Sequence, residues 1–185
     1  MDFVEGLPLS NGLSIVLVVV DKMSKYAHFT HLAHPYTASK MAQVFVNHII
    51  KLHGMPTSVV SDRDPTFTSM FWKKLFRMQG ITLKMSTSYH PQTNGQTKII
   101  NKSLENYLRC FAHDRPKQWI SWLPWAEYWY NTSWQGSIKM TPFEAVYGRL
   151  PPRLLTYVLG TTQVAAMDEI LKSREEILAL LQHNL

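Results

Sequence analysis

The sequence contains little cysteine, no long apolar run and few acidic residues. Its single cysteine, Cys110, excludes an internal disulfide framework and any zinc site built from several cysteines, and it fits a reducing environment. No stretch approaches the roughly 18 consecutive apolar residues of a membrane span, so no membrane contact is expected. The opening residues, MDFVEGLPLS, lack the basic and apolar segments of a signal peptide.

Basic residues outnumber acidic residues, which points to a polyanionic partner. Lysine and arginine total 19 against 13 aspartates and glutamates, leaving a formal net charge of +6, and nucleic acid is the first partner that such an excess favours. Charge alone leaves a second interpretation open, that of a basic soluble domain without such a partner. With 185 residues, 45% of them hydrophobic, the chain can form about one domain with a substantial core.

The order of the predicted elements is typical of an α/β fold with a mixed sheet, because strands come first and helices alternate with strands afterwards. The β-branched run Ile15–Val20 predicts a buried strand, followed by a turn at 21–25 and a second strand through Phe29. Further strands are expected just before Asp62 and at 81–86. Helices are expected from Thr37 or Ser39 to Gly54 and at 69–80, 96–111, 122–131, 141–148 and 164–185.

Local signals define the ends of two of these helices. Thr141 is expected as an N-cap, with Pro142 at the first helical position, Glu144 completing a capping box and Gly148 at the end. Pro124 indicates that the helix expected at 122–131 starts or kinks at that residue, because proline lacks the backbone N–H of a helix interior.

Two acidic residues, Asp2 and Asp62, stand at predicted strand positions. Carboxylates on neighbouring strands can share divalent cations, and two such ions stabilise the attacking and leaving oxygens of a phosphoryl displacement. Magnesium suits this chemistry because it prefers oxygen ligands. Asp21 and Asp64 are equally acidic, however, and an aspartate at a strand end is often a turn or cap residue. The residue types alone therefore leave the metal ligands undecided.

A spacing and a set of motifs point to a family. Thirty-five residues, 63–97, separate Asp62 from position 98, which follows the polar loop YHPQTNGQT. At this point the chain resembles the integrase catalytic core of gypsy-type long-terminal-repeat retrotransposons. The matching stretches follow that family's order from residue 1 to about residue 152: MDFVEGLP, VVVDKMSKYAHF, SDRDPTFTSMFW, SYHPQTNGQT, LPWAEYWYN and TPFEAVYGRLP.

The resemblance implies an RNase H-like α/β fold, with a mixed five-stranded sheet flanked by helices. Residues 1–152 would form the catalytic core, with its first strand clipped at the N-terminus. Residues 153–185 would form a linker and an amphipathic helix that lead toward a missing C-terminal module. The zinc-binding module that precedes the core in full integrases is also expected to be absent.

The resemblance also implies an Asp, Asp, Glu triad that binds two Mg²⁺ or Mn²⁺ ions and catalyses DNA integration. Asp2 matches the first aspartate and Asp62 the second, whereas Asp21 and Asp64 match positions that are not catalytic. In 3′-end processing an activated water attacks the DNA, and in strand transfer a DNA 3′-hydroxyl attacks the target.

The third catalytic position departs from the family, because it is Lys98 where the pattern has glutamate. A protonated lysine has three donors and no lone pair for a metal, and its charge would repel the second ion. Glu105 is seven residues further along the predicted helix, roughly 10 Å away along the axis, and is too distant to replace it. We therefore expect weakened metal binding and an impaired or inactive enzyme. The alternative is a non-catalytic remnant, or a co-opted module that binds nucleic acid or protein.

The resemblance further implies contacts with DNA, both element ends and target. Tyr89, Gln92 and Asn94 match an active-site loop that touches DNA, with Tyr89 able to stack on a base or sugar. Lys102 matches a DNA-contacting position one helical turn beyond Lys98. A solvated loop residue is the alternative for each. A homo-oligomer is expected, located in the nucleus when it acts on DNA and otherwise in the cytoplasm.

Three histidines, His28, His31 and His34, lie at intervals of three and raise the question of a metal site. The segment is predicted as a strand that ends near Pro35, and residues three apart in a strand point to opposite faces. The histidines are therefore expected to have structural roles.

Overall fold

The computed structural model describes residues 1–85, 95–112, 116–152, 167–168 and 172. The chain divides into two compact units, Met1–Arg149 and Leu150–Leu185. The elements that form the candidate site all belong to the first unit. No described helix is long and apolar enough to cross a membrane.

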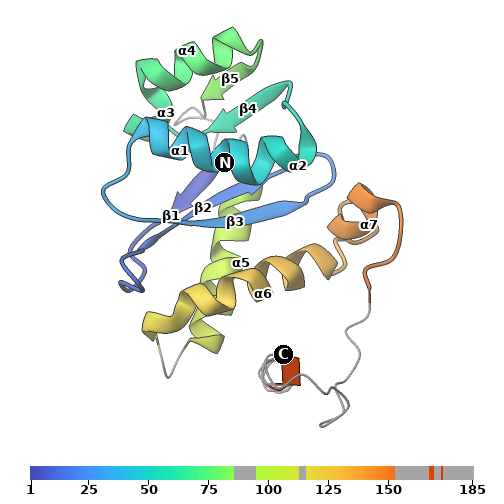
Figure 1. The fold of residues 1–185 in the computed structure, drawn as a ribbon. Coiled ribbons are helices and arrows are strands. Elements are labelled where there is room, and N and C mark those ends of the chain that lie inside the picture. The colour runs from blue at the N-terminus through green and yellow to red at the C-terminus, as the bar shows by residue number, and fades with distance from the viewer. Residues whose placement is uncertain (86–94, 113–115, 153–166, 169–171, 173–185) are drawn as a thin grey trace. The chain divides into compact units, whose positions relative to one another are not determined.

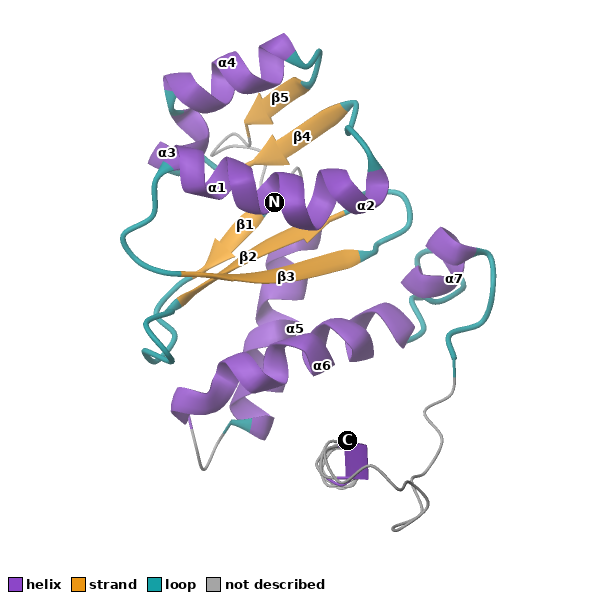
Figure 2. Cartoon of the chain, viewed as in Figure 1, coloured by secondary structure: helices purple, strands orange, loops and turns teal. Residues whose placement is uncertain are grey.

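The strands of the first unit form two groups (Figures 1 and 2). β1 (Asp2–Val4), β2 (Ile15–Val20) and β3 (Ala27–Leu32) make an antiparallel sheet in the order β1-β2-β3. β4 (Ser58–Ser61) and β5 (Thr82–Met85) pair in parallel. The β-branched run of β2 lies in the middle of the larger sheet, as its apolar sequence predicts.

The expectation of one five-stranded sheet is wrong in its detail, because the structure has a three-stranded and a two-stranded sheet. The amino nitrogen of Met1 donates a hydrogen bond of 2.7 Å to the carbonyl oxygen of Val60, which joins the start of β1 to β4. One such bond is not a ladder, and β1 is three residues long. The described strands therefore show the mixed α/β class without a continuous sheet.

Helices pack on the strands. α5 contacts β1 and β2, α6 contacts β3, and α1 contacts α4; in Figure 2, α1 and α2 lie on the opposite side of the larger sheet from α5 and α6. The helical elements are α1 (Ala38–Phe45), η1 (Val46–Ile50, a π-helix), α2 (Lys51–His53), α3 (Pro65–Thr68), α4 (Met70–Met78), α5 (Gly95–Phe111), η3 (Pro116–Gln118, a 3₁₀-helix), α6 (Trp119–Thr132) and α7 (Pro142–Tyr147).

The helix ends follow the local signals, with one exception. The Thr37 side chain accepts from the backbone N–H of Lys40 at the start of α1, and Thr141 and Glu144 form the predicted capping box of α7. α6 instead begins at Trp119 and has Pro124 inside it, so a start at Pro124 is wrong, and the alternative, a kink at that residue, stays a prediction. Trp119 is buried, and its indole N–H donates to the carbonyl oxygen of Pro8 at 2.7 Å, which holds the first turn of α6 in place.

The main core lies between the sheet and the helices α1 and α4. Ile15 and Leu17 of β2 belong to the same buried cluster as Phe45, Trp72 and Phe76. The ring of Trp72 lies 4.6 Å from that of Phe76 and 6.0 Å from that of Phe45, in edge-to-face arrangements. Aromatic pairs in this geometry add stability beyond their buried area.

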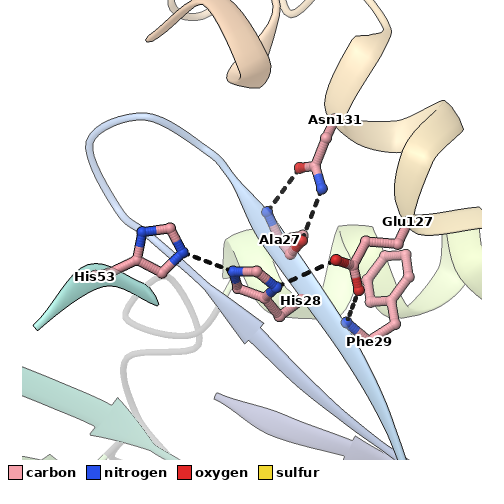
Figure 3. Close-up of polar contacts among 6 residues, drawn as sticks. All are labelled: Ala27, His28, Phe29, His53, Glu127 and Asn131. Carbon is pink, nitrogen blue, oxygen red and sulfur yellow. Dashed lines mark hydrogen bonds and ion pairs between the residues drawn. The ribbon is translucent and has the colours of Figure 1, made fainter. Parts of the chain in front are cut away.

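The outer edge of β3 is closed by side chains of α6 (Figure 3). Asn131 accepts from the backbone N–H of Ala27 and donates to its carbonyl oxygen, both at 2.8 Å. One turn earlier, Glu127 accepts from the backbone N–H of Phe29 at 2.7 Å. β3 is an edge strand, and such strands present unpaired backbone groups. Here two side chains satisfy the outward N–H and carbonyl oxygen of Ala27 and the N–H of Phe29.

Candidate active site

Asp2 lies on β1 and is held there by two donors. Its Oδ1 accepts from the backbone N–H of Phe3 at 3.0 Å, and its Oδ2 accepts from the side-chain amide of Asn101 at 3.2 Å. Asn101 belongs to α5, which packs on β1. The half-buried carboxylate of Asp2 thus sits where the first strand and α5 meet.

Asp62 directly follows β4, and its Oδ1 accepts from the backbone N–H of Asp64 at 3.2 Å. The other two candidate aspartates have structural partners. The Asp64 carboxylate accepts from the Thr66 backbone N–H at 2.8 Å and caps α3. Asp21 accepts from the backbone N–H and the hydroxyl of Ser24, both at 2.7 Å, within the predicted turn. All three aspartates thus accept a hydrogen bond from a backbone N–H two or three residues further along the chain, so these local contacts do not by themselves distinguish Asp62.

The charges of the site act on one another. Burial raises the pKa of Asp2 above its ordinary value, and the negative charge of Asp62 raises it further. The hydrogen bond from the backbone N–H of Phe3 and the positive charge of Lys98 oppose this rise in the pKa of Asp2. The charges of Asp62 and Lys98 thus both act on Asp2; that the three residues form one catalytic site stays a prediction. A pair of carboxylates in this state favours a bound cation, which relieves their mutual repulsion.

Lys98 lies in the first turn of α5, on its exposed surface. Its ammonium group supplies positive charge to the site but no ligand for a metal. Glu105 is exposed two turns further along the same helix, roughly 10 Å away along the axis. Among the described residues, no group of three or more histidines, cysteines, aspartates or glutamates is placed to hold a metal ion.

The donor set decides which ions the site can accept. Two carboxylates suit one divalent cation that prefers oxygen, such as magnesium, with water completing its coordination. A second ion would need a third carboxylate, and Lys98 stands at that position. The residues present therefore fit one cation and do not fit the two-ion arrangement.

The predicted DNA-contacting residues are only partly described. Tyr89, Gln92 and Asn94 lie outside the described residues. Lys102 is exposed on α5, one turn beyond Lys98, as expected. Sequence reasoning missed Asn101, although its place three residues after position 98 puts it on the same helical face.

The histidines do not gather into one site. His28 bonds through Nδ1 to Oε1 of Glu127 at 3.2 Å, and through Nε2 to Nε2 of His53 at 2.8 Å (Figure 3). His31, also on β3, is largely exposed. Partial burial of its ring lowers its pKa, and the charge of His48 lowers it further. His28 thus joins β3 to α6 and α2, which is a structural role.

The chain is similar to integrases and retrotransposon polyproteins. Residues 1–91 match the integrase core domain, a segment that includes Asp2 and Asp62 and ends before Lys98. The Tf2-3 and Tf2-4 transposon polyproteins of Schizosaccharomyces pombe (strain 972) are each 35% identical over 151 residues, which is 82% of this chain and 11% of the polyprotein. The chain thus spans about a tenth of the length of these curated relatives.

Solved structures share the fold. A simian T-cell lymphotropic virus intasome in complex with the PP2A regulatory subunit B56 gamma has a chain with a TM-score of 0.66 and 19% identity, covering 88% of this chain and 59% of its own. The HTLV-2 integrase catalytic core domain, solved with magnesium in a trimeric form, gives 0.61 and 16%, covering 78% and 93%. The BIV integrase core gives 0.55 and 23%, covering 77% and 91%. Together the likenesses show that this chain is similar in sequence to the integrase core domain and shares the fold of retroviral integrase catalytic cores.

Proposed function

We propose that this chain is the catalytic core of a gypsy-type retrotransposon integrase, whose substrates are the DNA ends of the element and a target DNA. The observation that supports this most is the pairing of Asp2 and Asp62. The charge of Asp62 raises the pKa of Asp2, whereas Asp21 and Asp64 are engaged in a turn and a helix cap. The match of residues 1–91 to the integrase core domain includes both paired aspartates.

Asp2 and Asp62 would hold a divalent cation, Mg²⁺ or Mn²⁺, and the HTLV-2 core was solved with magnesium. When bound in such a site, the ion polarises a phosphoryl oxygen and activates the attacking oxygen. The chain's own residues contribute the two carboxylates and the exposed cation Lys102, which can bind a DNA phosphate. Function in the nucleus follows from this proposal, because the DNA target is located there.

We propose that Lys98 impairs catalysis by this chain. It gives the site a positive charge where a second ion needs a carboxylate, and its charge acts on Asp2. This observation also favours the second candidate function, a non-catalytic module that binds nucleic acid or protein through the same fold. The two candidates share the fold and the family and differ in what position 98 permits.

We further propose that the active form is a homo-oligomer bound to DNA. The simian virus relative is an intasome, and the HTLV-2 core occurs in dimeric and trimeric forms.

The deciding experiment measures strand transfer after the chain is grafted into a related full-length integrase. The Lys98 form and a Lys98→Glu variant are compared, each with and without Asp62→Asn. We expect Lys98→Glu to raise the joining rate about 100-fold or more, the scale on which one electrostatic group affects kcat, and Asp62→Asn to abolish it. Robust joining by the Lys98 form that Asp62→Asn abolishes would refute the proposed impairment.

A binding measurement tests the second candidate. If the chain binds nucleic acid without catalysis, its DNA affinity should fall as salt is added, because phosphate contacts release counterions. Salt-independent binding, or no binding at low salt, would argue against a basic nucleic-acid surface.

A further inference from the structure

Asn101 has an unusual hydrogen-bonding state for a residue beside a candidate active site. Its side-chain nitrogen donates to Oδ2 of Asp2 at 3.2 Å. Its side-chain oxygen Oδ1 is buried and has no hydrogen-bond partner among the residues that the structure describes. Most buried polar atoms in proteins are hydrogen-bonded, so each exception requires an explanation.

The orientation of the amide follows from Asp2. An ionised carboxylate only accepts hydrogen bonds, so the amide must present its nitrogen to Asp2. If the amide of Asn101 were flipped, its oxygen would face Oδ2 of Asp2, and two acceptors would oppose each other. With the nitrogen directed at Asp2, the oxygen is left without a partner, and the fold bears the cost of that buried group. The contact with Asp2 therefore determines the state of the whole amide.

The same contact fixes the orientation of the Asp2 carboxylate. Its two oxygens have different donors, the backbone N–H of Phe3 for Oδ1 and the amide of Asn101 for Oδ2. The donors come from different elements, β1 and α5. Two donors at separate oxygens restrict rotation of the carboxylate plane. A ligand carboxylate is commonly held in this way by partners that do not touch the metal.

Packing alone does not account for an amide at this position. Ile100 and Leu104 of α5 are buried and supply apolar contact between the helix and the sheet. A leucine at 101 would keep the branching of asparagine at Cγ, with a larger apolar volume, and would leave no unpaired polar atom at position 101 itself. An asparagine that costs stability in the fold is explained if its donor is needed at Asp2.

We infer that Asn101 is a positioning residue for Asp2, whose amide holds the carboxylate in the orientation that receives a divalent cation. The inference rests on the proposed function in one respect, the binding of a cation by Asp2. The contact itself can be tested without it.

The test replaces Asn101 with leucine, with Asn106→Leu as the matched control. Asn106 is exposed on the same helix. Thermal unfolding and Mn²⁺ affinity, measured by water-proton relaxation, are determined for each variant in the parent chain and in the Lys98→Glu background. We expect Asn101→Leu to unfold at the same or a higher temperature and to bind Mn²⁺ about tenfold more weakly, the lower end of the effect of an outer-shell partner. Asn106→Leu should change neither quantity.

A lower unfolding temperature with unchanged Mn²⁺ affinity in Asn101→Leu would overturn the inference, because it would show a purely structural role. Asn101→Gln, which retains an amide donor, should recover part of the affinity.

A second measurement tests the contact even if the Asn101 variant does not fold or the chain binds no metal. The side-chain ¹H–¹⁵N signals of Asn101 should shift in Asp2→Ala, because the amide loses its acceptor, and those of Asn106 should not. Absence of Mn²⁺ binding even with Lys98→Glu would refute the proposed metal site while this signal still tests the contact. Unshifted Asn101 signals would refute the positioning role.

Discussion

Replacing Asn131 with leucine should destabilise the protein, because it removes the two hydrogen bonds between the Asn131 side chain and the backbone of Ala27 at the edge of β3. Ala27 is fully buried, and Asn131 is 2% exposed. The substitution leaves both the N–H and the carbonyl oxygen of Ala27 without their side-chain partners. Each orphaned buried group costs about 1–3 kcal/mol, so the loss of both partners should lower the free energy of unfolding by about 2–6 kcal/mol. For a domain of this size, at about 2–4 °C per kcal/mol, that corresponds to a fall in Tm of about 4–24 °C.

Thermal and urea unfolding, followed by circular dichroism, measure this effect. Leucine keeps the branching of asparagine at Cγ but is larger, so the measured loss includes some overpacking as well as the lost hydrogen bonds. Asn106→Leu on the exposed surface of α5 is the control and should change stability by less than about 0.5 kcal/mol. A loss for Asn131→Leu no larger than that of the control would show that Ala27 finds other partners, and would refute the reasoning.

Two further predictions concern the site and the core. The pKa of Asp2 is raised above its ordinary 3.8 by burial and by Asp62, so the folded state loses stability as pH rises through that raised pKa. Asp2→Asn should therefore raise Tm at pH 7 and have little effect below the ordinary pKa; an equal change at both pH values would contradict this. Trp72→Ala should lower the free energy of unfolding by about 3–5 kcal/mol in urea titrations, because it opens a cavity, and a loss under 1 kcal/mol would contradict its central place in the core.

Local patterns predicted the features that depend on neighbouring residues. The caps at Thr37 and Thr141 and the turn at Asp21 follow from side chains that bond within three residues of themselves. The resemblance singled out Asp2, Asp62 and position 98, and the charges of Asp62 and Lys98 both act on Asp2. These signals depend on side chains, backbone groups or periodicities within a few neighbouring residues, so they can be recognised in the sequence.

Features that depend on distant contacts were not predictable in this way. The start of α6 is set by Trp119, which bonds to Pro8 across 111 positions, and this outweighs the local signal of Pro124. The pairing of Asn131 with Ala27 spans 104 positions. The division into two sheets depends on how β1 meets β4, which no local pattern encodes. The contact of Asn101 with Asp2 likewise exists only after α5 packs on β1.

The closure of β3 by α6 restricts how copies of this protein can join. Many proteins associate by adding a strand from one molecule to a free sheet edge of another. The outward N–H and carbonyl oxygen of Ala27 already bind Asn131, and the N–H of Phe29 binds Glu127. A neighbouring strand could pair there only by displacing both side chains. A multimer built on this edge must therefore use side-chain packing, which is sensitive to the residues on its surface, in place of a shared sheet, which any extended segment could extend.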